Sequence, residues 1–132
     1  MRKLYLCFFC LILPLASGCN APSSGEVHFR GTVTVDGVPV ETGVIDFEAV
    51  NRDTSSGGGA IRNGAYTARV MPGEKIVRIV ASKIVREYTD NEGNPVVEYE
   101  PLVPAKKFWG NSELRETITY KTKELNFDLK SE

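Results

Sequence analysis

The stretch "VHFRGTVTV", residues 27–35, decides the fold class of this chain. Its apolar and polar residues alternate, with the following on one side: Val27, Phe29, Gly31, Val33 and Val35. The residues between them are polar: His28, Arg30, Thr32 and Thr34. A period of two that is rich in β-branched residues is typical of a strand with one buried face. We therefore predict a half-buried strand whose His28 points to solvent.

The segments that follow carry the same signals. "DGVP", residues 36–39, has turn chemistry. "GVIDFEAV", residues 43–50, alternates again, so we expect it to pair antiparallel with residues 27–35. "NRDTSSGGG", residues 51–59, is predicted to be a flexible surface loop. It is not a phosphate-binding loop, because no Lys-Ser/Thr pair and no helix signal come after its glycines.

The middle of the chain continues as strands. "RNG", residues 62–64, is a turn signal before the alternating segment "AYTARV", residues 65–70. "KIVRIVASKIVREY", residues 75–88, fits either a helix or a strand by its apolar spacing. Its many β-branched residues and the Pro-Gly before it favour a strand, with a bulge near Lys83.

The last third completes an all-β chain. "TDNEGNP", residues 89–95, is predicted to be a hairpin tip, after which "VVEYE" pairs back. Residues 100–110 contain two prolines and are expected to be an extended connection that covers the sheet. "LRETITY", residues 114–120, and "LNFDL", residues 125–129, are two further strands. We therefore predict a seven- to eight-stranded antiparallel β-sandwich without a long helix.

Four blocks of this pattern carry a family resemblance. They are "GTVTVDGVPVETGVIDFEAV" (31–50), "NGAYTARVMPGEKIVRIVASK" (63–83), "LVPAKKFWGNSELRETITY" (102–120) and "LNFDLKSE" (125–132). In content and order they resemble small secreted bacterial lipoproteins with a transthyretin-like or carboxypeptidase-regulatory-like domain. The resemblance implies a prealbumin-like, Ig-like sandwich and supplies almost no biochemical activity.

The N-terminus has the layout of an export signal. Arg2 and Lys3 precede an uncharged apolar run, "LYLCFFCLILPLA", at residues 4–16. That run is shorter than the ~20 residues that cross a bilayer, which argues against a permanent transmembrane helix. Cys7 and Cys10 lie inside the run and would be removed with it, so they are not a redox or metal pair.

A lipid attachment site is predicted where this signal ends. The residues before Cys19 resemble the lipobox of bacterial lipoproteins: Leu15, Ala16, Ser17 and Gly18. The resemblance implies a lipid on the Cys19 thiol and cleavage just before it. We then expect a signal peptide at 1–18, a short tether at 19–25 and a β-sandwich domain at 26–132. The alternative is an ordinary signal peptide that leaves Cys19 as a free thiol.

Catalytic chemistry is poorly represented in the sequence. The chain has one histidine, His28, and no Gly-x-Ser-x-Gly elbow. Zinc would need three or four suitable ligands, which are not available. Asp90 and Glu92 could ligate calcium, but turn chemistry accounts for both residues. We predict no enzyme activity, no metal and no cofactor.

The remaining predictions concern partners. The 16 Lys and Arg residues are interspersed with 17 Asp and Glu residues, so no basic patch is expected and nucleic acid is not supported. We predict an exported protein that is lipid-anchored to a bacterial membrane, in the periplasm or at the cell surface, with a structural role or a protein or glycan partner. The alternative is a carbohydrate- or small-ligand-binding accessory module that uses the aromatic residues Phe108, Trp109, Tyr88 and Tyr99. Burial of Phe108 and Trp109 is the favoured expectation, and the two tyrosines are expected to pair across the hairpin.

Overall fold

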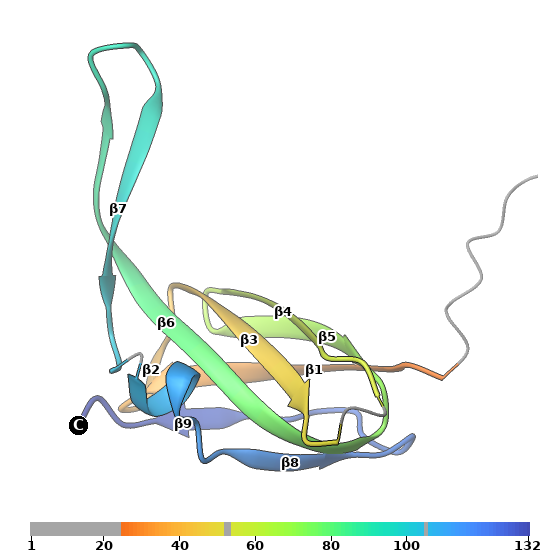
Figure 1. Ribbon diagram of the computed structural model, residues 1–132. Helices are drawn as coiled ribbons and strands as arrows, with labels where there is room; N and C mark the ends of the chain where they lie inside the picture. Colours follow the sequence, from red (N-terminus) through yellow and green to blue (C-terminus); the bar gives the residue numbers. More distant parts are fainter. Residues whose placement is uncertain (1–24, 52–53, 105) are drawn as a thin grey trace, which may run out of the picture.

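The computed structural model describes residues 25–51, 54–104 and 106–132 (Figure 1). The predicted signal segment, the lipobox and Cys19 lie outside the described residues. Within the described ranges, a helix that is both long enough and apolar enough to cross a membrane is not found.

The fold is all-β, as the alternation predicts. Its strands are β1 (Val27–Val35), β2 (Val38–Pro39), β3 (Thr42–Ala49), β4 (Gly57–Arg62), β5 (Ala65–Val70), β6 (Gly73–Thr89), β7 (Pro95–Pro101), β8 (Arg115–Ile118) and β9 (Phe127–Leu129). One helical turn, η1 (Lys106–Gly110), accompanies them. The nine strands found in the described residues form one sheet, in which β9 pairs in parallel and the other strand pairs are antiparallel. Figure 1 shows that the sheet curls, so that β8 and β9 lie opposite β3 and β4.

The strand order is β2-β1-β5-β4-β3-β6-β7, with β8 on β6 and β9 on β1. The expected pairing of β1 with β3 is therefore wrong, because β1 pairs with β5 and β3 lies between β4 and β6. The turn at Asp36 and Gly37, both with positive φ, returns only the two-residue strand β2 onto β1. The chain then crosses to the far side of the sheet.

The core fills the inside of the curled sheet. Buried side chains alternate along β1 and β5, as predicted. At its centre Phe47 of β3 contacts Phe29 edge to face, with ring centroids 5.2 Å apart. Phe127 of β9 lies 6.5 Å from the same ring, so the C-terminal strand packs on the core formed by the earlier strands.

Gly57, Gly58 and Gly59 form the start of strand β4, which corrects the prediction of a loop at residues 51–59 for its last three positions. A Cβ atom built on Gly58 would lie 2.1 Å from the Ile45 carbonyl oxygen of β3. A Cβ atom on Gly59 would lie 2.1 Å from the Thr67 carbonyl oxygen of β5. The glycines are therefore needed because the backbones of both neighbouring strands approach β4 closely.

Strand β6 is predicted correctly, and so is its bulge, which shifts the register between Ile84 and Arg86. Up to Ser82 the strand pairs with β3 inside the body of the domain. From Lys83 onward its strand partner among the described residues is β7. We call residues 83–100 the arm, and Figure 1 shows this hairpin projecting away from the rest of the domain.

The connection after β7 covers the edge of β6 between β7 and β8. Leu102 N donates to the Ala81 carbonyl at 2.9 Å, and Val77 N donates to the Leu114 carbonyl at 3.0 Å. The buried Ser112 hydroxyl donates to the Val77 carbonyl. The connection covers the sheet, as expected, but residues 106–110 form a helical turn and are not extended. The turn places Phe108 in the core.

Candidate functional site

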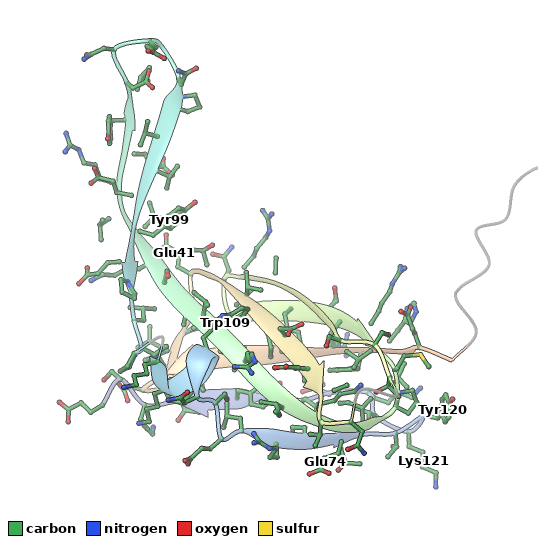
Figure 2. All side chains as sticks on the ribbon, in the orientation of Figure 1. Glu41, Glu74, Tyr99, Trp109, Tyr120 and Lys121 are labelled. Atoms are coloured by element: carbon green, nitrogen blue, oxygen red, sulfur yellow. The ribbon has the colours of Figure 1, made fainter. Side chains whose placement is uncertain are left out.

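The structure separates the four predicted aromatic contact residues. Phe108 is buried, as expected, but the expected burial of Trp109 is wrong, because its side chain is 37% exposed on the body. The Trp109 carbonyl accepts a hydrogen bond from the Arg78 guanidinium. Tyr88 and Tyr99 belong to the arm, and Figure 2 shows Tyr99 near its base. The ring pairs found among the described residues all lie in the core and include none of these four.

The two tyrosines of the arm do not face each other, so the predicted cross-strand pair is wrong. Tyr88 lies opposite Val96, and Tyr99 lies opposite Ile84. The hairpin register places the two tyrosines several residues apart along the arm. The ring of Tyr88 instead contacts the Arg86 guanidinium, 4.7 Å from the ring centroid.

The register gives the arm two different faces, because residues directly opposite each other share a face. One face carries the pairs Ile84–Tyr99, Glu87–Val97 and Thr89–Pro95. The other carries Lys83–Glu100, Arg86–Glu98 and Tyr88–Val96. The Lys83 ammonium and the Glu100 carboxylate form an ion pair at 2.9 Å. The first face is therefore mostly apolar and the second is mostly charged.

Polar contacts fix both ends of the arm. At the base, Ile84 N donates to the Glu41 carboxylate at 3.0 Å. At the tip, the Asp90 carboxylate accepts from the backbone N–H groups of Glu92 and Asn94. These hydrogen bonds, with that from the Asn94 side chain, lower the pKa of Asp90. The Asp90 carboxylate, which was considered as a calcium ligand, therefore stabilises the turn. The described residues contain no group of three or more side chains that could hold a metal ion.

A second surface was not predicted from the sequence. Two adjoining hollows of about 520 and 680 Å³ lie on the outer face of β1, β5 and β4. They share Arg30 and Thr67. We call them together the basic groove, and its other outward-facing lining residues are His28, Thr32, Gly58, Ala60, Arg62, Ala65, Arg69, Lys123 and Glu124.

The strand register explains how these residues meet. Across β1 and β5, His28 lies opposite Arg69 and Arg30 lies opposite Thr67. Arg62 of β4 lies opposite Ala65 of β5. The C-terminal segment runs along the other side of β1, where Arg30 N donates to the Lys123 carbonyl at 3.2 Å. Side chains from three distant parts of the sequence, namely β1, the β4–β5 hairpin and the C-terminal segment, therefore border one groove.

The groove carries unbalanced positive charge. Arg30, Arg62, Arg69 and Lys123 border it, and Glu124 is the one carboxylate in its lining. Glu124 accepts from the Asn126 side chain at 2.8 Å. The ion pairs found in the described part of the chain are elsewhere: Glu48–Arg78, Lys83–Glu100 and Asp128–Lys130. The expectation of no basic patch is therefore wrong for this surface.

Lys75 is a buried cation that sequence reasoning also missed. It is fully buried on β6, and its ammonium donates to the Thr54 hydroxyl at 2.9 Å and the Ser55 carbonyl at 3.2 Å. Burial lowers the pKa of its ammonium. Both acceptors belong to the segment that leads into β4, so Lys75 ties this segment to the body.

The fold and these two surfaces define an all-β domain with an exposed arm and a basic groove. No family model matches the chain, and a search of curated proteins finds no similar sequence. Among solved structures, the crystal structure of a 9R-lipoxygenase from Cyanothece PCC8801 is similar at 14% sequence identity, with a TM-score of 0.41. The match covers 84% of this chain but only 17% of that enzyme. A likeness at this level carries no argument about the function of this chain.

Proposed function

We propose that this chain is a non-catalytic envelope lipoprotein whose arm contacts a partner protein. In this proposal a lipid on Cys19 holds the β-domain at a bacterial membrane, in the periplasm or at the cell surface. The domain itself is of the transthyretin-like or carboxypeptidase-regulatory-like kind. The single observation that carries the proposed binding role is the arm, residues 83–100, which projects from the body (Figure 1).

The side chains of the arm support a contact role. Val85 is 50% exposed and Tyr99 is 57% exposed, and Tyr88 is exposed as well. A two-stranded hairpin alone is only marginally stable in water. Large apolar side chains that stay exposed on the arm therefore add little to the stability of the fold. Tyr88 lies on the mostly charged face and Val85 at the bulge, whereas Tyr99 lies opposite Ile84 on the mostly apolar face, and exposed apolar residues that adjoin one another are typical of protein interaction sites. Tyrosine in particular is enriched in the centres of such interfaces.

The edges of the arm indicate how the partner is contacted. Pro95 and Pro101 stand at the two ends of β7, and the charged residues Glu98 and Glu100 lie between them. Proline and charge on an edge strand discourage the addition of another strand. We therefore expect contact through the apolar face of Ile84, Val97 and Tyr99 rather than through the backbone of β7.

Site-specific photo-cross-linking in intact cells tests this role. A photoreactive phenylalanine analogue replaces Tyr99 in one variant and Tyr120 in a matched control. Tyr120 is 70% exposed but lies on the body, far from the arm in Figure 2. We expect a discrete protein adduct from position 99 only. Equal adducts from both positions, or none from position 99, would contradict the proposed role.

The anchor is tested separately. Cys19→Ala removes the only thiol to which the lipid could be attached in the expected mature chain, so the variant should leave the membrane fraction and accumulate as an unprocessed precursor. Metabolic labelling with a radioactive fatty acid should label the native chain and not the variant. A variant that is processed normally and still fractionates with membranes would show that the anchor proposal is wrong.

The alternative, a carbohydrate-binding module centred on Trp109, receives less support. Phe108 is buried, and the tyrosines lie on the arm rather than beside Trp109. Trp109 is therefore not grouped with the other three residues predicted to contact a ligand. The hollow next to η1 is lined by Phe108 and Leu114 and does not include Trp109.

A further inference from the structure

We infer that the basic groove on β1, β5 and β4 binds a linear anionic polysaccharide. This inference goes beyond the proposed function, because it names a ligand class for a surface separate from the arm. Three properties of the groove support it: the charge, the shape and the polar lining.

Charge comes first. Arg30, Arg62 and Arg69 reach the groove from three neighbouring strands, and the described residues offer none of them an ion-pair partner. The whole chain has a formal charge of −1, so this local excess of cations runs against the average. Arginine forms paired hydrogen bonds with planar anions such as carboxylates. Three such side chains around one groove therefore fit a ligand with repeated negative charges.

Shape comes second. The lining of the groove combines small residues, Gly58, Ala60 and Ala65, with the longer side chains of Arg30, Arg62 and Arg69. At Gly58 an added Cβ would lie 2.1 Å from the Ile45 carbonyl oxygen, so the close approach of β3 favours glycine at this position. The groove follows β1 from His28 to Thr32, about 13 Å at ~3.3 Å per residue. A narrow chain fits such a groove better than a flat bilayer surface does.

The polar lining favours a polysaccharide over a nucleic acid as the ligand of the groove. Single-stranded nucleic acids bind to grooves where bases stack on aromatic side chains. The two aromatic residues at this groove, Phe29 and Tyr66, are buried in the core and offer no exposed ring face. The Thr67 hydroxyl can instead exchange hydrogen bonds with sugar hydroxyls, and the Thr32 hydroxyl, which donates to the Asn126 side chain, can still accept one.

The test uses the full chain in polyoxyethylene detergent micelles, which contain no sugar. The probe is fluorescein-labelled oligogalacturonate, and its fluorescence anisotropy reports binding. We expect Arg30→Gln, Arg62→Gln and Arg69→Gln each to raise the dissociation constant about tenfold, because each removes a charge-assisted hydrogen bond. Added NaCl should weaken the binding, because it screens exposed charges.

Arg86→Gln is the matched control, because it removes an exposed arginine from the arm and leaves the groove unchanged. It should bind the probe as the native chain does. Near-ultraviolet circular dichroism of each variant checks that the fold is intact. Unlabelled oligogalacturonate should displace the probe, whereas neutral dextran should not.

Several results would overturn the inference. These are failure of the native chain to bind the probe, equal weakening by Arg86→Gln, displacement by dextran, or displacement by poly-glutamate or oligothymidylate as effective as by oligogalacturonate. None of these results depends on cross-linking from position 99. Failure of the groove and failure of the arm are therefore distinguishable.

Discussion

The body of the domain and the arm share one strand, yet they differ in how that strand is paired and buried. Up to Ser82, β6 lies between β3 on one side and β8 and the η1 connection on the other. Val77, Ile79 and Ala81 alternate there as buried residues. Beyond Lys83 the same strand has β7 as its one strand partner among the described residues. The alternation of buried and exposed residues ends at this point.

This difference teaches that strand formation and burial are separate properties of a sequence. Both halves of β6 are rich in β-branched residues, which suit an extended backbone. Only the first half has a second layer on which to bury them. In the body, apolar side chains therefore contribute to the stability of the fold, whereas in the arm they remain available for contacts.

The largest expected effect is at the centre of the body. Phe47→Ala removes a fully buried ring that contacts Phe29, Tyr66 and Phe127. Truncation of a buried phenylalanine costs about 3–5 kcal/mol. Urea unfolding followed by circular dichroism should show this loss. Val85→Ala on the arm is the comparison, and an equal loss there would abolish the distinction between the two regions.

A smaller effect is expected where the body is held together by close backbones. Gly58→Ala places a Cβ 2.1 Å from the Ile45 carbonyl oxygen and 2.9 Å from Asp46 Cα. The strands must separate to admit it, at a cost of about 1–3 kcal/mol. Gly110→Ala is the control, because no atom lies within 4 Å of its added Cβ. If thermal unfolding shifts equally in both variants, the close approach at β4 is not what requires glycine.

The sequence predicted the strands better than it predicted their neighbours. The alternation in β1 and β5 identified which side chains are buried, because this property depends on the local period of two. The expected β1–β3 pairing was wrong, because pairing depends on where the chain crosses after the short strand β2. The glycines of β4 resembled a loop, because the close backbones that require them belong to strands distant in the sequence.

The two candidate surfaces show the same limit. Residues 89–95 were predicted to be a hairpin tip, but the exposure of the arm depends on β3 ending its pairing at Ser82. The basic groove depends on the strand order β1-β5-β4, which brings Arg30, Arg69 and Arg62 together. In the sequence each arginine is a single charge at an ordinary strand or turn position. If the strand order had been known, outward-facing arginines on adjacent strands would have predicted the basic groove.

An acid-dependent effect is expected at the edge of the body, where β9 meets the β1–β2 turn. The Asp128 carboxylate accepts from the Thr34 hydroxyl, Gly37 N and the Lys130 ammonium. These hydrogen bonds, that from Lys130 foremost, lower its pKa to about 2. A carboxyl with a lowered folded pKa contributes stability above its unfolded pKa of ~3.9, and this contribution is lost as the pH falls toward 2.

Asp128→Asn should remove this part of the pH dependence. We expect the free energy of unfolding of the native chain to fall more steeply between about pH 4 and pH 2 than that of the variant. Urea unfolding at a series of pH values measures both slopes. Parallel slopes would mean that the carboxylate has no preferential partners in the folded state.

The smallest expected effect belongs to the arm, and it tests the comparison most directly. Tyr99→Ser removes a ring that is 57% exposed, so the free energy of unfolding should change by less than about 0.5 kcal/mol. Tyr66→Ser is the matched substitution in the body, where the ring is buried and its hydroxyl donates to the Leu125 carbonyl at 2.8 Å. It should cost several kcal/mol, about as much as other truncations of buried aromatic residues. If urea unfolding gave similar losses for both variants, the Tyr99 ring would stabilise the folded body. The apolar face of the arm would then not be free for a partner, and the proposed function would lose the observation on which it rests.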